Sequence, residues 1–179
     1  GLHFKPYDDA VFNPIIKQEI IDATPTDDGH ISVYLPHYSI AYLEPFFLAA
    51  SNYHFEVFSA EVTSIRNYKN IIYFPISNSV FTKSMIRAHA VITGGGFETP
   101  AEAMYMNKKV LSIPIAKHYE QLSNAVALSE LGVKVILKID QDFNAIFTNW
   151  MKYASPVKLE LTHSTKDIVA QLINQTKND

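Results

Sequence analysis

Short apolar runs alternate with longer amphipathic stretches along most of the chain. The runs are rich in isoleucine and valine and end at proline or glycine, which is typical of buried strands. The stretches between them carry apolar residues at helical spacing. The pattern predicts strands at residues 31–35, 54–58, 70–74, 89–93, 109–113 and 133–137. It predicts helices at residues 40–51, 79–87, 99–106, 119–131, 140–153 and 164–174.

This alternation of strand and helix predicts the α/β class. Strands that are each followed by a helix form a parallel sheet covered on both faces, and right-handed crossovers make it a three-layer, doubly wound Rossmann-like sheet. Residues 1–29 do not follow the rhythm: 12–20 is expected to be extended and 24–29 is a turn-rich linker. We therefore expect an interdomain connection at 1–29, the Rossmann-like domain at 30–155 and a C-terminal helix within 156–179. Whether that helix crosses to an N-terminal domain outside these residues or packs on its own sheet stays open.

The composition excludes several classes of protein. The 179 residues carry a formal net charge of −3 without a block of lysine and arginine, so a nucleic-acid partner is not expected. The absence of cysteine excludes disulfide scaffolds, thiol nucleophiles and cysteine-bound metals. No apolar run approaches the roughly 20 residues that span a bilayer. We expect a cytoplasmic protein, with peripheral attachment to the inner membrane face left open, and a piece of a longer chain because it starts without methionine.

The candidate site is a run of three consecutive glycines among only six in the chain. Gly94, Gly95 and Gly96 follow a predicted strand and precede a helix with Thr99 and Pro100 in its first turn. In open α/β sheets ligands lie at this edge, and the N–H groups of a helix start attract anions such as a diphosphate. Thr99 can cap the helix or bind a phosphate oxygen. A tight turn without a ligand is the alternative, and the run is neither a P-loop nor a dinucleotide fingerprint.

The order of motifs over residues 31–137 resembles the nucleotide-sugar-binding half of GT-B glycosyltransferases. It comprises the glycine turn, a glutamate on the next helix, a small residue and proline around the next strand, and Glu-Gln-x-x-Asn-Ala from residue 120. The pattern is similar to that of UDP-glycosyltransferases and of the enzyme that adds GlcNAc to lipid-linked muramyl peptide. Residues 12–20 and 30–36 also resemble the linker and first strand of bacterial members.

The resemblance implies a role for each motif in donor binding. Glu102 matches the acid that accepts hydrogen bonds from both ribose hydroxyls. Glu120 and Gln121 match the pair that binds hydroxyls of the donor sugar, and the base is expected near Phe74 and Ile76. The other matched positions form or brace the diphosphate turn: Gly95, Gly96, Phe97, Thr99 and Asn124.

Structural alternatives for these residues stay open at the level of sequence. Glu102 can be an exposed acid on its helix. Glu120 and Gln121 can cap a helix, and Phe74 and Phe97 can belong to the core. Relatives often place a cation just before the glycines, where this chain has Gly94. Three residues are candidates to replace that cation: Lys83, Arg87 and Lys117. His37, after the first strand, can approach the diphosphate or the acceptor, or be a surface residue.

The resemblance implies transfer of a sugar from a nucleotide diphosphate, with UDP expected, to an acceptor hydroxyl. Helix-end N–H groups stabilise the leaving group without a metal or cofactor, and a general base takes the acceptor proton. The base and the acceptor pocket are expected in an N-terminal domain that these residues do not contain. The acceptor class (sugar, lipid or small molecule) stays open. A nucleotide-sugar epimerase-like domain and a catalytically inactive nucleotide-binding module are the alternatives.

Overall fold

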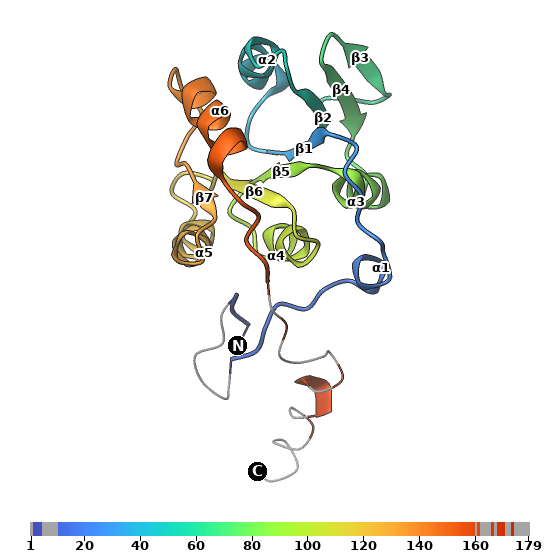
Figure 1. Ribbon diagram of the computed structural model, residues 1–179, viewed down its shortest axis with the longest axis vertical. Coiled ribbons are helices and arrows are strands. Elements are labelled where there is room, and N and C mark those ends of the chain that lie inside the picture. The colour runs from blue at the N-terminus through green and yellow to red at the C-terminus, as the bar shows by residue number, and fades with distance from the viewer. Residues whose placement is uncertain are drawn as a thin grey trace.

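A seven-stranded sheet forms the centre of the molecule (Figure 1). The computed structural model describes residues 2–4, 11–159, 161, 166, 168–170 and 173. In these residues the strand order is β3-β4-β2-β1-β5-β6-β7. The strands are β1 (His30–Tyr34), β2 (His54–Ser59), β3 (Arg66–Tyr68), β4 (Ile71–Pro75), β5 (Ala90–Thr93), β6 (Lys109–Ser112) and β7 (Lys134–Val135).

All neighbouring strands are parallel except the edge pair β3–β4. Apart from β3, the sheet has the strand order of the doubly wound Rossmann fold, and the direction of winding reverses between β1 and β5. The predicted α/β class and doubly wound sheet are therefore confirmed. The carboxyl ends of β1 and β5 mark the place where such folds bind their ligands. Strand β3 was not predicted, because its three residues are all exposed and show no apolar alternation.

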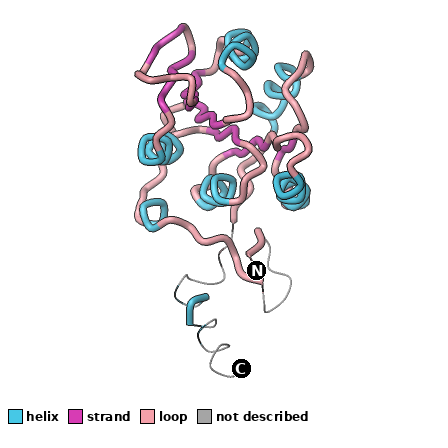
Figure 2. Tube along the Cα trace, turned by 180° about the vertical axis from the view of Figure 1, so that it is seen from behind, coloured by secondary structure: helices cyan, strands magenta, loops and turns pink. Residues whose placement is uncertain are grey.

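Helices cover both faces of the sheet. In Figure 1, α2 and α6 lie on one face and α3, α4 and α5 on the other, and Figure 2 shows α1 beside this second layer from behind. Each layer has its own buried apolar core, so the architecture is three layers. The helices are α1 (Gln18–Ile21), α2 (Ile40–Ala49), α3 (Asn78–Arg87), α4 (Glu98–Tyr105), α5 (Tyr119–Glu130) and α6 (Phe143–Tyr153).

Packing in the second core fixes the helices that flank the glycine turn. Met104 of α4 and Leu128 of α5 are fully buried there beside Val91 of β5. Burial of side chains of this size contributes roughly 1.5–3 kcal/mol each. Both helices are therefore held firmly against the strands that carry the turn.

The segment before β1 packs on the domain rather than standing apart from it. Phe4, Ile16 and Ile20 belong to the second core, and the backbone N–H of Thr26 donates to Ile86 O at 3.1 Å. The extended conformation predicted for residues 12–20 is wrong at its end, where α1 begins at Gln18. Its role as a connection between domains stays a prediction.

The predicted last helix at 164–174 is described only in part. Residues 166, 168–170 and 173 are helical, and the rest of that stretch lies outside the described residues. None of the helices in the described part of the chain has the length and apolar character needed to cross a membrane.

Candidate functional site

The three glycines after β5 meet different surroundings. A Cβ on Gly95 would lie 2.5 Å from the carbonyl oxygen of Gln121 and 2.9 Å from Cβ of Pro114. The absence of a side chain at Gly95 therefore lets the turn pack on the start of α5. A Cβ on Gly96 would have no heavy atom within 4 Å. Protein packing explains Gly95 but not Gly96, which faces open space where a ligand can approach the backbone.

Side chains from α5 and β6 brace the turn. The Gln121 Oε1 accepts hydrogen bonds from the N–H groups of Gly95 (3.1 Å) and Ile115 (2.9 Å). Asn124 Nδ2 donates to Gly95 O at 3.1 Å, and Ser112 Oγ donates to Gly94 O at 3.3 Å. The carboxamide oxygen of Gln121 is thus engaged in holding the turn against the start of α5.

The start of α4 is uncapped. The helix begins at Glu98 after Phe97, and no side chain caps it, so the alternative that Thr99 acts as the cap is wrong. Within the described residues, the backbone N–H groups of Gly96, Phe97, Glu98 and Thr99 have no hydrogen-bond partner. Unpaired N–H groups and the positive end of the helix dipole together favour an anion at this position.

The start of α2, the helix that follows β1, is capped by side chains of the protein. The Ser39 Oγ accepts from the N–H of Tyr42 at 3.3 Å. The two carboxylate oxygens of Glu61 accept from the N–H of Ile40 at 3.2 and 3.4 Å. The carboxylate of Glu61 therefore occupies the start of α2. Of these two helix starts, that of α4 can receive an anion from outside the protein.

A cavity of about 260 Å³ opens beside the start of α4. Its wall carries Ile76, Thr99 and Glu102, so three of the ten predicted site residues meet there. The aromatic part of the wall comes from β1, β2 and α3 and was not predicted from the sequence: Tyr34, Phe58 and Phe81.

The aromatic rings of this wall pack on one another. The ring centroid of Phe81 lies 5.5 Å from that of Tyr34 and 5.1 Å from that of Phe58. Phe74 stacks on Phe58 at 5.0 Å and does not line the cavity, in agreement with a core role for its side chain. The polar residues at the mouth belong to the β4–α3 loop and the start of α3: Ser77 and Asn78.

Glu102 is the most enclosed charged group on the cavity wall. It is 2% exposed, so the alternative of an exposed helical acid is wrong. Its Oε1 and Oε2 lie 3.2 and 3.5 Å from Nζ of Lys17. Burial raises the pKa of the Glu102 carboxyl group, and the positive charge of Lys17 opposes that effect.

Lys17 is a basic residue on the wall of this cavity that was not predicted from the sequence. It lies directly before α1, in the segment interpreted as a linker, 85 residues from Glu102. A single lysine between isoleucine pairs carries no local signal of such a contact. Among the proposed substitutes, Arg87 is paired with Asp28 at 2.7 Å and with Glu56 at 3.5 Å. Asp28 lies two residues before β1, so Arg87 lies near the amino ends of the strands and away from the glycine turn.

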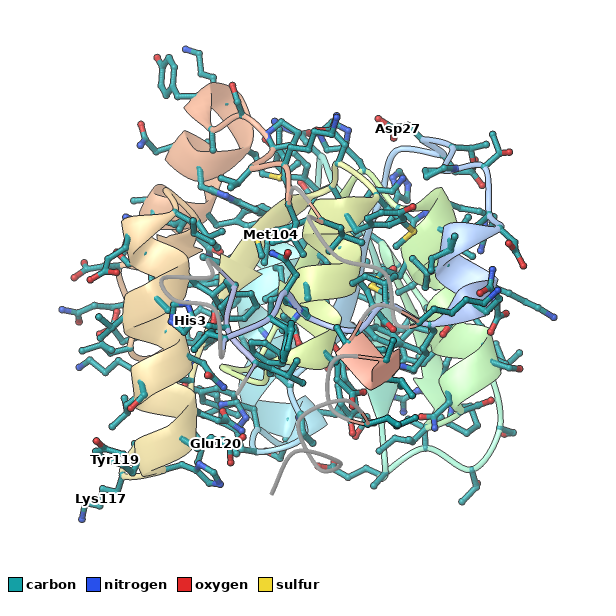
Figure 3. All side chains as sticks on the ribbon, turned by 90° about the horizontal axis from the view of Figure 1, so that it is seen from below. His3, Asp27, Met104, Lys117, Tyr119 and Glu120 are labelled. Carbon is teal, nitrogen blue, oxygen red and sulfur yellow. The ribbon has the colours of Figure 1, made fainter. Side chains whose placement is uncertain are left out.

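The predicted donor-sugar residues lie on the α5 side of the turn. Figure 3 shows Lys117, Tyr119 and Glu120 together at the amino end of α5, and Asp27 at the opposite edge of the molecule. All three are exposed, and Lys117 has a left-handed backbone with φ of 65°. The cap of α5 is His118, whose Nδ1 accepts from the N–H of Gln121, so neither Glu120 nor Gln121 is that cap. Glu120 does not line the cavity.

His37 occupies the turn at the carboxyl end of β1. Both of its ring nitrogens are buried and find no hydrogen-bond partner within the described part of the chain. Burial lowers the pKa of the ring, which packs 4.5 Å from that of Tyr38. The residue is therefore not an ordinary surface histidine. The described residues also contain no group of three or more acidic or histidine side chains placed to hold a metal ion.

Comparisons with known proteins agree with this architecture. The family model described as glycosyl transferase family 1 matches residues 4–164. No curated protein sequence matches the chain. Solved structures similar to it include the spinosyn forosaminyltransferase SpnP, with a TM-score of 0.60, 14% identity and coverage of 97% of this chain and 52% of that one.

Two further structures are similar. MurG of Acinetobacter baumannii has a TM-score of 0.55 and 16% identity, over 88% of this chain and 52% of that one. The glycotransferase of kitacinnamycin has a TM-score of 0.57 and 14% identity, over 80% of this chain and 40% of that one. At these identities the likeness concerns the fold, which is that of GT-B glycosyltransferases. The chain spans about half the length of these relatives or less.

Proposed function

The chain belongs to glycosyl transferase family 1, and from that membership we propose that it forms the domain that binds the nucleotide-sugar donor. The uncapped start of α4 carries the proposal. It sits at the carboxyl edge of the sheet, next to a cavity with a buried carboxylate on its wall. A nucleoside diphosphate needs an anion site and, close to it, an acceptor for ribose hydroxyls, and both lie within the first turns of α4.

Each part of a nucleotide has a matching group. Phosphate oxygens accept from the free N–H groups between Gly96 and Thr99 and from the Thr99 hydroxyl. The ribose hydroxyls donate to the carboxylate of Glu102, one turn further along α4. The base lies against Ile76 and the aromatic wall of the cavity. We propose UDP as the nucleotide, and Glu120 and the Nε2 of Gln121 as contacts of the sugar beyond the diphosphate.

The same groups support sugar transfer. In the reaction the bond between the anomeric carbon and the diphosphate oxygen breaks, and negative charge grows on the diphosphate. N–H groups fixed at the start of α4 stabilise that charge without having to reorganise. We therefore propose a reaction that needs no metal ion. The acceptor oxygen forms the new bond to the anomeric carbon, and its proton passes to a general base.

We place that base and the acceptor pocket in a second domain, since the chain spans about half the length of its structural relatives. The acceptor is a sugar, a lipid or a small molecule, and a cytoplasmic site, in solution or at the inner membrane face, suits a nucleotide-sugar donor. A second candidate is a nucleotide-binding module without catalysis. The glycine at position 94, where relatives often place a cation, favours this alternative, whereas Lys17 on the cavity wall supplies a cation from another segment and opposes it.

Calorimetric titration with UDP, dTDP and GDP, followed by UDP-GlcNAc and UDP-glucose, tests the proposal. We expect saturable binding that weakens in Glu102→Gln, which keeps the shape of the side chain and removes its charge. Glu130→Gln, an exposed acid at the end of α5, is the matched control and leaves the affinity unchanged. A folded protein that binds none of these ligands would refute donor binding. Binding without transfer by the longer protein would favour the inactive module.

A further inference from the structure

The ion pair between Lys17 and Glu102 joins two side chains of unequal exposure. The Nζ atom of Lys17 lies 3.2 Å from the Glu102 carboxylate and 3.8 Å from that of Glu98. The Lys17 side chain is 50% exposed and that of Glu102 only 3%. The lysine is therefore the partner with room to rotate, because half of its side chain is exposed whereas that of Glu102 is almost fully buried.

Binding of a ribose to Glu102 would disturb this pair. The two hydroxyls would take up carboxylate oxygens that now face the ammonium group of Lys17. Hydroxyls donate hydrogen bonds but carry no charge, so they do not replace the carboxylate as a counter-charge for the lysine. A ligand that brings only hydroxyls must displace a cation, whereas a ligand that also brings an anion gives that cation a new partner.

A diphosphate at the start of α4 supplies the new partner within reach of the lysine. Glu98, 3.8 Å from Nζ, is the first residue of α4, and Lys17, Thr99 and Glu102 share the wall of one cavity. We propose that Lys17 determines specificity by exchanging its ion pair, from Glu102 in the free protein to the diphosphate in the complex. This inference rests on the proposed function and extends it. The exchange makes the site select nucleoside diphosphates over nucleosides.

The backbone around Lys17 is fixed, so a side-chain rotation suffices for the exchange. Ile16 and Ile20 on either side are 4% and 1% exposed and belong to the second core. The Lys17 carbonyl accepts from the N–H groups of Ile20 and Ile21 at 2.9 and 3.1 Å. The segment that carries the lysine therefore stays packed while its ammonium group moves between two anions.

The test compares the affinities of UDP, dTDP and GDP with those of uridine, thymidine and guanosine. Calorimetry gives the ratio of nucleoside Kd to diphosphate Kd for the wild type and for Lys17→Met, which keeps the apolar stem and loses the charge. We expect the ratio to fall about tenfold or more, because the diphosphate loses a charge-assisted contact and the nucleoside no longer competes with an ammonium group. Lys17→Arg keeps most of the ratio.

Lys134→Met provides the control, since Lys134 is exposed on β7 and its substitution changes the net charge equally. Its ratio should match that of the wild type. An equal fall in both methionine variants would assign the effect to net charge and overturn the role of Lys17. A wild type that binds a diphosphate, with an unchanged ratio in Lys17→Met, overturns the inference and leaves donor binding intact. A wild type that binds no diphosphate refutes both.

Discussion

Adding one methyl group at Gly95 or at Gly96 should separate the stability of the glycine turn from its role in binding. The two residues are neighbours, and neither has a backbone φ in the left-handed region that disfavours alanine. Their surroundings differ: the Cβ of Gly95→Ala would meet the Gln121 carbonyl oxygen at 2.5 Å, whereas that of Gly96→Ala would meet nothing within 4 Å. The pair is therefore an internally controlled experiment.

The expected loss of stability in Gly95→Ala follows from those contacts. The neighbours at 2.5 and 2.9 Å are backbone and Cβ atoms of Gln121 and Cβ of Pro114, which cannot rotate away, so overpacking costs roughly 1–3 kcal/mol. A shift of the turn also strains the bonds of Gly95 with Gln121 and Asn124, each worth about 1 kcal/mol. We expect a total loss of about 2–4 kcal/mol, and each kcal/mol lowers Tm by roughly 2–4 °C.

Gly96→Ala should behave in the opposite way. Its stability stays within about 0.5 kcal/mol of the wild type, because the methyl group meets no protein atom. Its affinity for a nucleoside diphosphate falls, because the methyl group stands where phosphate oxygens approach the backbone. Urea unfolding gives the stabilities and calorimetry the affinities. A Gly95→Ala variant as stable as the wild type would refute the packing argument, and full affinity in Gly96→Ala would refute the position of the diphosphate.

Two further predictions concern residues away from the turn. Burial lowers the pKa of His30, so the unfolded chain binds the proton more tightly; unfolding free energy should fall as pH drops below about 6.5, by at most about 1.4 kcal/mol per pH unit. The difference between the wild type and His30→Gln across pH 7.5 to 5.5 isolates this contribution, and a constant difference would contradict it. Glu61→Ala should lower stability by about 1 kcal/mol in urea unfolding, because the N–H of Ile40 loses its cap. Ser64→Ala in the same exposed loop is its control, and equal stabilities would count against the cap.

The sequence predicted the parts of the fold that local patterns determine. Buried strands rich in isoleucine and valine and the glycine run after β5 identify the sheet and its ligand edge, because both depend on residues close in the chain. Strand β3 was not predicted, because its residues are exposed and form an edge strand only by pairing with β4. The aromatic wall of the cavity was not predicted, because a phenylalanine in a buried strand, such as Phe58, has the same sequence pattern as a core residue. The role of Lys17 was not predicted, because its contact with Glu102 depends on tertiary packing.

The two helix starts at the carboxyl edge show how side chains select one site from a nearly symmetric fold. Doubly wound topology places α2 after β1 and α4 after β5 on either side of the crossover point, and each helix brings a partial positive charge. Glu61 neutralises the first from within the protein. The second lacks a cap and has a phenylalanine at the capping position. The proposed diphosphate site therefore lies at the start of α4, on the side of the cavity, Glu102 and Lys17, and this assignment depends on a few side chains rather than on the fold.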